Sequence, residues 1–137
     1  SFYTQHAQFD THAGEMLFHP VLWRDVSQAV GAFFDDLREH GRGENVIMYL
    51  FSEFGRRVRD NGSGTDHGAG GAAFVIGDAV KGGFYGEYPS RKSEDLEQGD
   101  LVPNYDFRGA YATITEDWLG LDSKPIVNGS FEKLGFL

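Results

Sequence analysis

Residues 46–51 read VIMYLF, an uninterrupted apolar run that follows the polar turn GRGEN at 41–45. A short run without polar and apolar alternation is typical of a strand that is covered on both faces in a parallel sheet. Before it, apolar residues recur at helical spacing from Pro20 to His40, and Gly41 is well placed to end that helix. Because a helix followed by a buried strand is half of a βαβ unit, we predict an α/β fold.

The remaining chain is predicted to add shorter elements around this core. Residues 1–12 are interpreted as an extended entry strand, and AAFVIG at 72–77 as a second short buried strand. Between the strands, residues 52–71 are rich in glycine and show little periodicity, which predicts a long functional loop. A second amphipathic helix is predicted over 107–118, ended by Gly120.

The composition limits the class of protein. A length of 137 residues fits one domain with a single core, so we predict one domain over 1–137. Apolar residues make up 40% and aromatic residues 15%, which argues against disorder. The net charge of −9 argues against a partner such as nucleic acid or an anionic membrane surface, because both would be repelled. No apolar run approaches the roughly 18 residues of a membrane span.

The chain contains no cysteine, so disulfides, thiolate metal sites and a cysteine nucleophile are excluded. Any metal must therefore be held by histidine and carboxylate side chains. The first residue is Ser1 and no signal-like segment follows it, which suggests a processed or truncated product.

Asp10 and His12 form the first candidate metal-binding pair. In an extended segment, side chains two residues apart leave the same face of the chain, so one cation could contact both. A carboxylate beside an imidazole suits Zn²⁺ or another divalent transition metal, and Mn²⁺ or Ca²⁺ stays open. The alternative is a capped turn beside a surface histidine.

Glu53 directly follows the apolar strand, at the kind of strand end where open α/β sheets bind their ligands. Its alternative is a helix start or a surface position. Three arginines follow closely, Arg56, Arg57 and Arg59, and guanidinium suits planar recognition of phosphate or sulfate. We expect Arg56 to stabilise charge on a transferred group, with solvated ion pairing as the alternative.

Asp66 and His67 lie in a glycine-rich stretch before the second strand. Adjacent strand residues point to opposite sides, so with His67 as a ligand, Asp66 would serve another metal or orient an imidazole. A nucleotide-binding P-loop is not favoured, because the stretch lacks a GK[ST] ending and precedes a strand. The other histidines are weaker candidates: His6, His19 and His40.

Several motifs in a fixed order resemble a known family. They are FDTHAGE at 9–15, SEFGR at 52–56 and TDHGAGGAAFVIGDAVKGGFYGE at 65–87. Together they resemble the C-terminal half of the domain-of-unknown-function 1501 family, which is similar to the alkaline phosphatase and sulfatase superfamily. The resemblance implies an alkaline-phosphatase-like sheet flanked by helices, present here as a C-terminal fragment.

The same resemblance implies a metal centre. Asp10, His12 and His67 would hold one metal, and Glu53 takes the place of the superfamily's usual Asp-His pair. Many family members carry a second histidine in TDHGHG, where this sequence has Ala69. We therefore expect fewer ligands than in the superfamily.

The implied activity is metal-dependent hydrolysis of phosphate or sulfate esters, with a divalent metal such as zinc, or manganese or calcium, polarising the ester oxygen. The nucleophile would lie in an N-terminal half, which a second chain would supply. The resemblance also implies export to the periplasm or beyond. The alternative function is a non-catalytic metal-binding or assembly module that retains the fold.

Overall fold

The computed structural model describes all 137 residues, and its longest element is helix α1, Glu15–Glu39. Its buried stripe consists of Leu22, Val26 and Phe34. Leu22 and Val26 follow the apolar spacing, whereas Phe34 is buried in place of Phe33, which is 43% exposed. Gly41, with φ of +64°, follows the end of the helix, as predicted. Although proline is best tolerated near a helix start, the predicted start at Pro20 is wrong. Contacts described below hold an earlier first turn.

Strands β1, Met48–Leu50, and β4, Phe74–Ile76, pair in a two-stranded antiparallel sheet. Both strands lie inside the apolar runs that predict them, but the predicted parallel pairing is wrong. Parallel neighbours need a crossover connection, usually a helix. The segment between β1 and β4 contains no helix and holds a hairpin instead, so the chain returns in the opposite direction.

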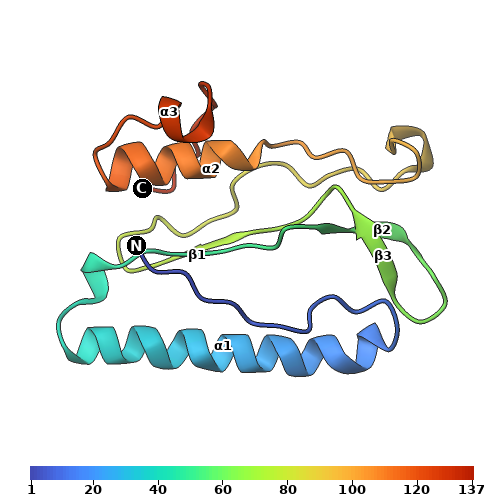
Figure 1. Cartoon of the computed structure of the whole chain (residues 1–137), viewed down its shortest axis with the longest axis horizontal. Helices are drawn as coiled ribbons and strands as arrows, with labels where there is room; N and C mark the ends of the chain where they lie inside the picture. The colour runs from blue at the N-terminus through green and yellow to red at the C-terminus, as the bar shows by residue number, and fades with distance from the viewer.

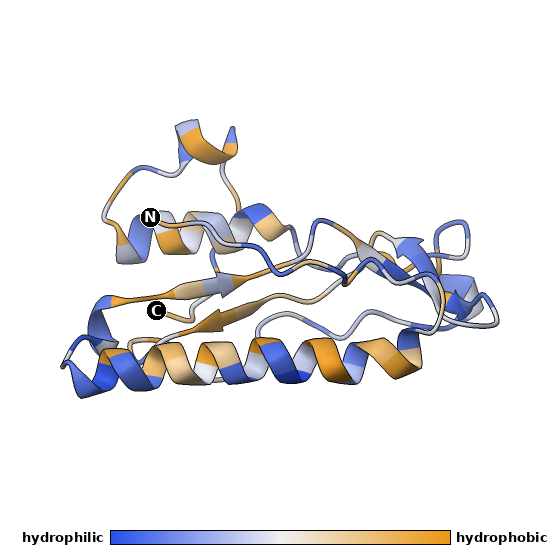
Figure 2. Ribbon diagram, turned by 60° about the horizontal axis from the view of Figure 1, so that its bottom comes forward, coloured by the Kyte–Doolittle hydropathy of each residue, from blue (hydrophilic) through white to orange (hydrophobic).

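Helices meet both faces of this sheet, which explains the uninterrupted apolar run. Tyr49 of β1 contacts Tyr111 of α2, Phe107–Thr113, with ring centroids 5.4 Å apart. Phe74 of β4 contacts Trp23 of α1, with ring centroids 5.9 Å apart. Figures 1 and 2 show the resulting layers, with α1 and α2 on opposite sides of the strands. The fold is therefore a small mixed α/β domain.

Strands β2, Gly55–Asp60, and β3, Thr65–Gly68, form an antiparallel hairpin where the glycine-rich sequence predicts a loop. That prediction is wrong because the strands carry mainly charged, solvent-exposed side chains and so lack the apolar alternation that marks a strand. The hairpin lies at one end of the molecule, beside the first turn of α1 (Figure 1).

Residues 1–12 form no strand, which corrects the predicted entry strand. The backbone of residues 9–12 is held by side chains of the hairpin rather than by a partner strand. Two short 3₁₀ turns connect the larger elements, η1 at Gly43–Asn45 and η2 at Ser93–Asp95.

The C-terminal part begins with α2, whose first turn is capped by the carboxylate of Asp106. A π-helical turn, η3 at Ile114–Trp118, continues it, and Gly120 with φ of +66° follows. This agrees with the helix predicted over 107–118. A short helix, α3 at Lys124–Val127, precedes the tail, where Phe136 is only 2% exposed.

Much of the apolar surface stays uncovered. The chain exposes 9845 Å², against about 7,100 Å² for a compact monomer of its mass. In the first turns of α1, Met16 and Leu17 are exposed by 84% and 77%. The exposed area is therefore large for a monomer of this mass. None of the helices combines the length and apolar character that a membrane span requires.

Candidate metal centre

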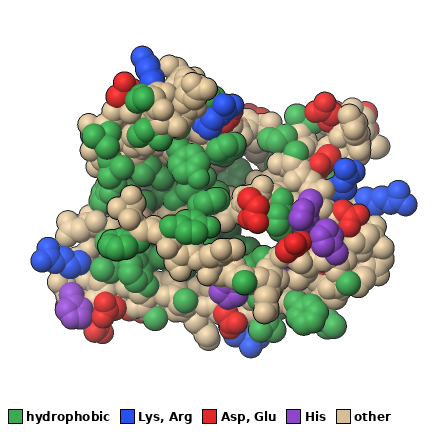
Figure 3. Space-filling view, viewed as in Figure 1, with side chains coloured by type: hydrophobic (Ala, Val, Ile, Leu, Met, Phe, Trp, Pro, Cys, Tyr) green, Lys and Arg blue, Asp and Glu red, His purple; other side chains and the backbone are tan.

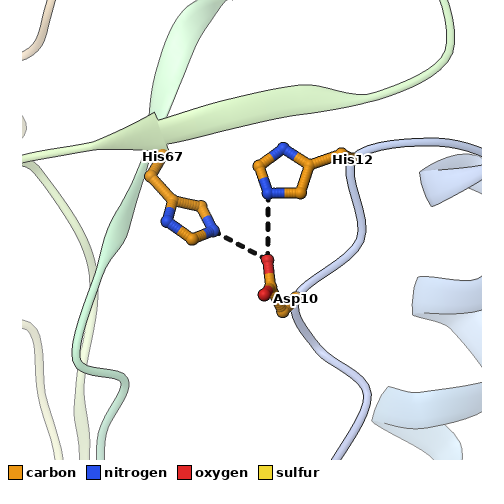
Figure 4. A group of neighbouring side chains, drawn as sticks. All are labelled: Asp10, His12 and His67. Carbon is orange, nitrogen blue, oxygen red and sulfur yellow. Dashed lines mark hydrogen bonds and ion pairs between the residues drawn. The ribbon is translucent and has the colours of Figure 1, made fainter.

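Asp10, His12 and His67 come together where the N-terminal segment meets the hairpin (Figure 4). Oδ1 of Asp10 lies 2.8 Å from Nε2 of His67 and 3.1 Å from Nε2 of His12. One potential ligand atom from each residue lies within 4.8 Å of the other two. The structure thus brings three of the predicted ligands together, although 57 positions separate Asp10 from His67.

Arg56 fixes the backbone of residues 9–12. Its Nη1 donates to the carbonyl oxygens of Thr11 at 2.8 Å and Thr65 at 2.6 Å, and its Nη2 donates to that of Phe9 at 2.6 Å. These bonds tie the N-terminal segment to both hairpin strands. Arg56 therefore acts as a positioning residue in this structure, and its expected contact with a transferred group stays a prediction.

The first turn of α1 joins the same unit. Thr11 Oγ1 lies 2.8 Å from Nε2 of His19, and Nδ1 of His19 lies 3.5 Å from a carboxylate oxygen of Glu15. The other Glu15 oxygen accepts from the backbone N–H and the hydroxyl of Thr65, at 2.7 and 2.8 Å. These contacts explain why the helix begins at Glu15, and they give His19 a structural role.

Asp66 orients one of the imidazoles. Its Oδ1 lies 3.3 Å from Nδ1 of His12, which leaves Nε2 facing Asp10. Of the two alternatives for Asp66, a second metal or an oriented imidazole, the geometry matches the second. The side-chain amide of Asn61 donates to Asp66 Oδ1 at 3.1 Å and to the carbonyl oxygen of His12 at 3.0 Å.

Asn61 is a residue that the sequence reasoning missed. Its Oδ1 accepts from the backbone N–H groups of Ser63 at 3.1 Å and Gly64 at 2.9 Å, and so shapes the hairpin loop. The signal was present, because the dipeptide formed with Gly62 is a strong turn marker between strands.

His67 is held by stacking. Its ring lies on the ring of Phe54, with centroids 3.8 Å apart and planes inclined by 10°. The nearby glycines allow close backbone approach, since a Cβ at Gly55 would lie 1.9 Å from the carbonyl oxygen of Gly70.

Glu53 is not part of this group. It is exposed on the segment after β1 and lines a larger groove beside the aromatic residues of α2. The prediction relied on the carboxyl ends of parallel strands, and β1 pairs antiparallel, so the rule does not apply.

The electrostatics keep both carboxylates of the site ionised. The pKa of Asp10 is lowered, first by the hydrogen bond from His67 and then by the charges of His67 and His12. The pKa of Asp66 is lowered by hydrogen bonds from Asn61 and then from His12. Both groups therefore keep their negative charge to lower pH than an ordinary aspartate would.

The donor set fits a divalent transition metal. Two imidazole nitrogens and one carboxylate oxygen suit Zn²⁺, whereas Ca²⁺ prefers an all-oxygen shell. Ligand atoms about 2.1 Å from a tetrahedral ion lie about 3.4 Å apart, so small side-chain movements would suffice. All three side chains are exposed, which leaves room for another ligand.

Comparison with known proteins places the chain in a family. A search of curated proteins and a search of solved structures each returned no match. A family model described as protein of unknown function (DUF1501) matches residues 2–129, a range that includes every residue of the site and both sheets. The chain therefore belongs to the DUF1501 family.

Proposed function

We propose that this chain is the metal-binding part of a metal-dependent hydrolase of phosphate or sulfate esters. The observation that carries the proposal is the convergence of two imidazoles and one carboxylate, with a further carboxylate behind one imidazole. Asp10, His12 and His67 would hold the metal, zinc by its donor preference. When bound, the metal would supply a Lewis acid at the ester oxygen.

The chain's own residues would prepare the site. Arg56 holds the backbone of residues 9–12 against the hairpin, and Asp66 fixes the His12 ring so that Nε2 faces the cation. A carboxylate that binds the other nitrogen of a ligating histidine also raises the basicity of the ligating nitrogen.

The resemblance to the alkaline phosphatase and sulfatase superfamily supports the ester class. On that resemblance the fold extends to a larger sheet, and the nucleophile lies on an N-terminal half outside these 137 residues. The uncovered apolar surface supports such a partner half, supplied by a second chain or a longer polypeptide. Export to the periplasm belongs to the same proposal.

Metal content tests the site directly. The chain is purified, exposed to zinc, manganese or calcium, dialysed and analysed for bound metal. We expect about one equivalent of zinc, lost in Asp10→Ala and in His67→Ala. His40→Ala is the matched control, because that ring bonds to a carbonyl oxygen of its own helix at 2.8 Å, outside the site. Equal zinc content in all these proteins would overturn the metal site.

Ester hydrolysis tests the reaction. A polypeptide that contains this chain and its partner half is assayed with aryl phosphate and aryl sulfate esters. We expect zinc-dependent turnover that falls by orders of magnitude in His67→Ala and is retained in His40→Ala. A zinc-loaded protein that hydrolyses neither ester would reject the hydrolase and leave the metal site intact.

A second candidate function is a non-catalytic metal-binding or assembly module. The exposed apolar residues at the first turns of α1 favour it, because they provide an interaction surface without requiring a nucleophile. A stable, zinc-loaded and inactive complex with the partner half would support this alternative.

A further inference from the structure

A cavity of about 930 Å³ lies on the hairpin beside the metal centre. Arg57 and Arg59 line it together with His67, one of the proposed metal ligands. Figure 3 shows histidine and carboxylate side chains gathered at one end of the face that it draws, with Lys or Arg side chains beside them. The cavity therefore places cationic side chains next to the candidate metal centre.

The two arginines are free to bind a ligand. Neither forms an ion pair, although the chain carries 21 acidic residues. By contrast, Arg38 pairs with Asp78 at 2.7 Å and Arg108 with Asp106 at 2.6 Å.

Arg57 is also anchored close to the metal centre. Its Nε donates to the carbonyl oxygen of His67 at 3.2 Å, which fixes the side chain and leaves both terminal nitrogens without a protein acceptor. A guanidinium held in this way can offer a pair of parallel N–H donors to a phosphate or sulfate oxygen pair.

The opposite wall of the cavity is built from a fixed turn. Gln98 and Gly99 line it, between Glu97 and Asp100, whose backbones pair. The Asp100 carboxylate accepts from the backbone N–H of Ala69 at 2.9 Å, which docks this turn on the segment after β3. Two tied segments thus line the cavity, which stays open to solvent.

The local charge makes anion binding depend on the metal. Asp10, Asp60 and Asp66 lie near the guanidinium groups of Arg56, Arg57 and Arg59, so the formal charge is about 0 without metal and about +2 with a divalent ion. An anion would gain little from the net charge in the first state and be attracted in the second.

We propose that this cavity binds the anionic phosphate or sulfate group of the ligand, with Arg57 and Arg59 as its donors. The proposal rests on the proposed function and adds an anion-binding role for the neighbours of Arg56, since both terminal nitrogens of Arg56 are bound to carbonyl oxygens. By thermodynamic reciprocity, bound anion must also tighten metal binding.

The test uses inorganic phosphate and sulfate, titrated calorimetrically into the zinc-loaded and the metal-free chain. Zinc affinity is measured separately. We expect phosphate or sulfate to bind the zinc-loaded chain, and to bind roughly tenfold more weakly in the Arg57→Gln/Arg59→Gln double variant at saturating zinc. Arg42→Gln, an exposed arginine beyond the far end of α1, is the control and should match the wild type.

The outcomes separate the two proposals. A chain that takes up zinc but binds phosphate and sulfate equally well in the wild type and the double variant overturns the anion cavity and leaves the metal centre. A chain that takes up no zinc overturns the proposed function. In that case, the anion cavity is supported if the metal-free wild type binds the anion and the double variant does not. It is overturned if the metal-free wild type binds no anion.

Discussion

Replacing Asn61 by alanine is the most informative perturbation of the site. This side chain is not a proposed metal ligand, and yet it connects the N-terminal segment with the hairpin. The substitution removes two donor contacts, to the His12 carbonyl oxygen and to Asp66, and two acceptor contacts, from Ser63 and Gly64. The first pair supports the proposed metal ligands, whereas the second pair shapes the hairpin loop.

The expected magnitudes follow from these four bonds. Each neutral hydrogen bond contributes about 0.5–1.5 kcal/mol net, and Asn61 is largely exposed, so we expect the free energy of unfolding to fall by about 1–3 kcal/mol. Loss of a partner behind a ligating histidine costs about 10–100-fold in metal affinity. Asn61 acts on Asp66 rather than on the imidazole itself, so we expect about tenfold.

The assay pairs urea unfolding of the metal-free chain with zinc titration against a competing chelator. Asn61→Asp separates the roles, because it keeps the acceptor for the loop but loses the donor and places a carboxylate against Asp66. It should recover stability more than zinc affinity. Asn45→Ala, a change with no side-chain hydrogen bond to lose, is the control. Wild-type zinc affinity in Asn61→Ala would refute the reasoning.

Three further predictions concern the fold. Gly55→Ala should open the base of the hairpin and abolish zinc binding, because its Cβ would meet the Gly70 carbonyl oxygen. By contrast, Gly31→Ala lies in open space on α1 and should raise the free energy of unfolding by about 0.5–1 kcal/mol. Thermal unfolding and metal content check both variants. Phe136→Ala should lower the free energy of unfolding by about 3–5 kcal/mol in urea, since the ring is fully packed. Arg108 lowers the pKa of Asp106 to about 2 from an ordinary 3.8, so the advantage of wild type over Asp106→Asn should be complete above pH 4 and vanish as the pH falls through 2, as measured by circular dichroism.

Periodicity predicted those parts of the fold where burial decides structure. Helix α1 and strands β1 and β4 lie within or around apolar patterns, but no residue of the apolar run at 46–51 is fully buried, so the predicted cover is only partial. The direction of pairing could not be obtained in this way. Antiparallel pairing follows from the hairpin between the strands, and nothing apolar marks that hairpin.

The candidate site was predictable as far as local spacing reaches. The extended spacing of Asp10 and His12 gave one side of the site, and the adjacency of Asp66 and His67 gave one ligand and one orienting group. Glu53 lies outside this group, because its placement assumed the end of a parallel strand and β1 pairs antiparallel.

The roles of the residues that connect the segments could not be predicted from the sequence. Arg56 reads as a ligand-binding arginine in sequence, and only the fold shows its guanidinium bound to backbone carbonyls of two segments. An unpaired backbone carbonyl has no sequence signature, so the acceptors of Arg56 could not be anticipated.

The hairpin violates local strand rules where the site is built, and this has a physical reason. A strand with an alternating apolar face would need a core to cover that face. Here polar links replace apolar packing: Arg56 binds the segment that carries Asp10, Asn61 closes the loop, and Glu15 caps the strand at Thr65. Each link holds a ligand-bearing segment to the hairpin. The order of the metal centre therefore depends on the same few hydrogen bonds that order the hairpin, and loss of one should weaken both together.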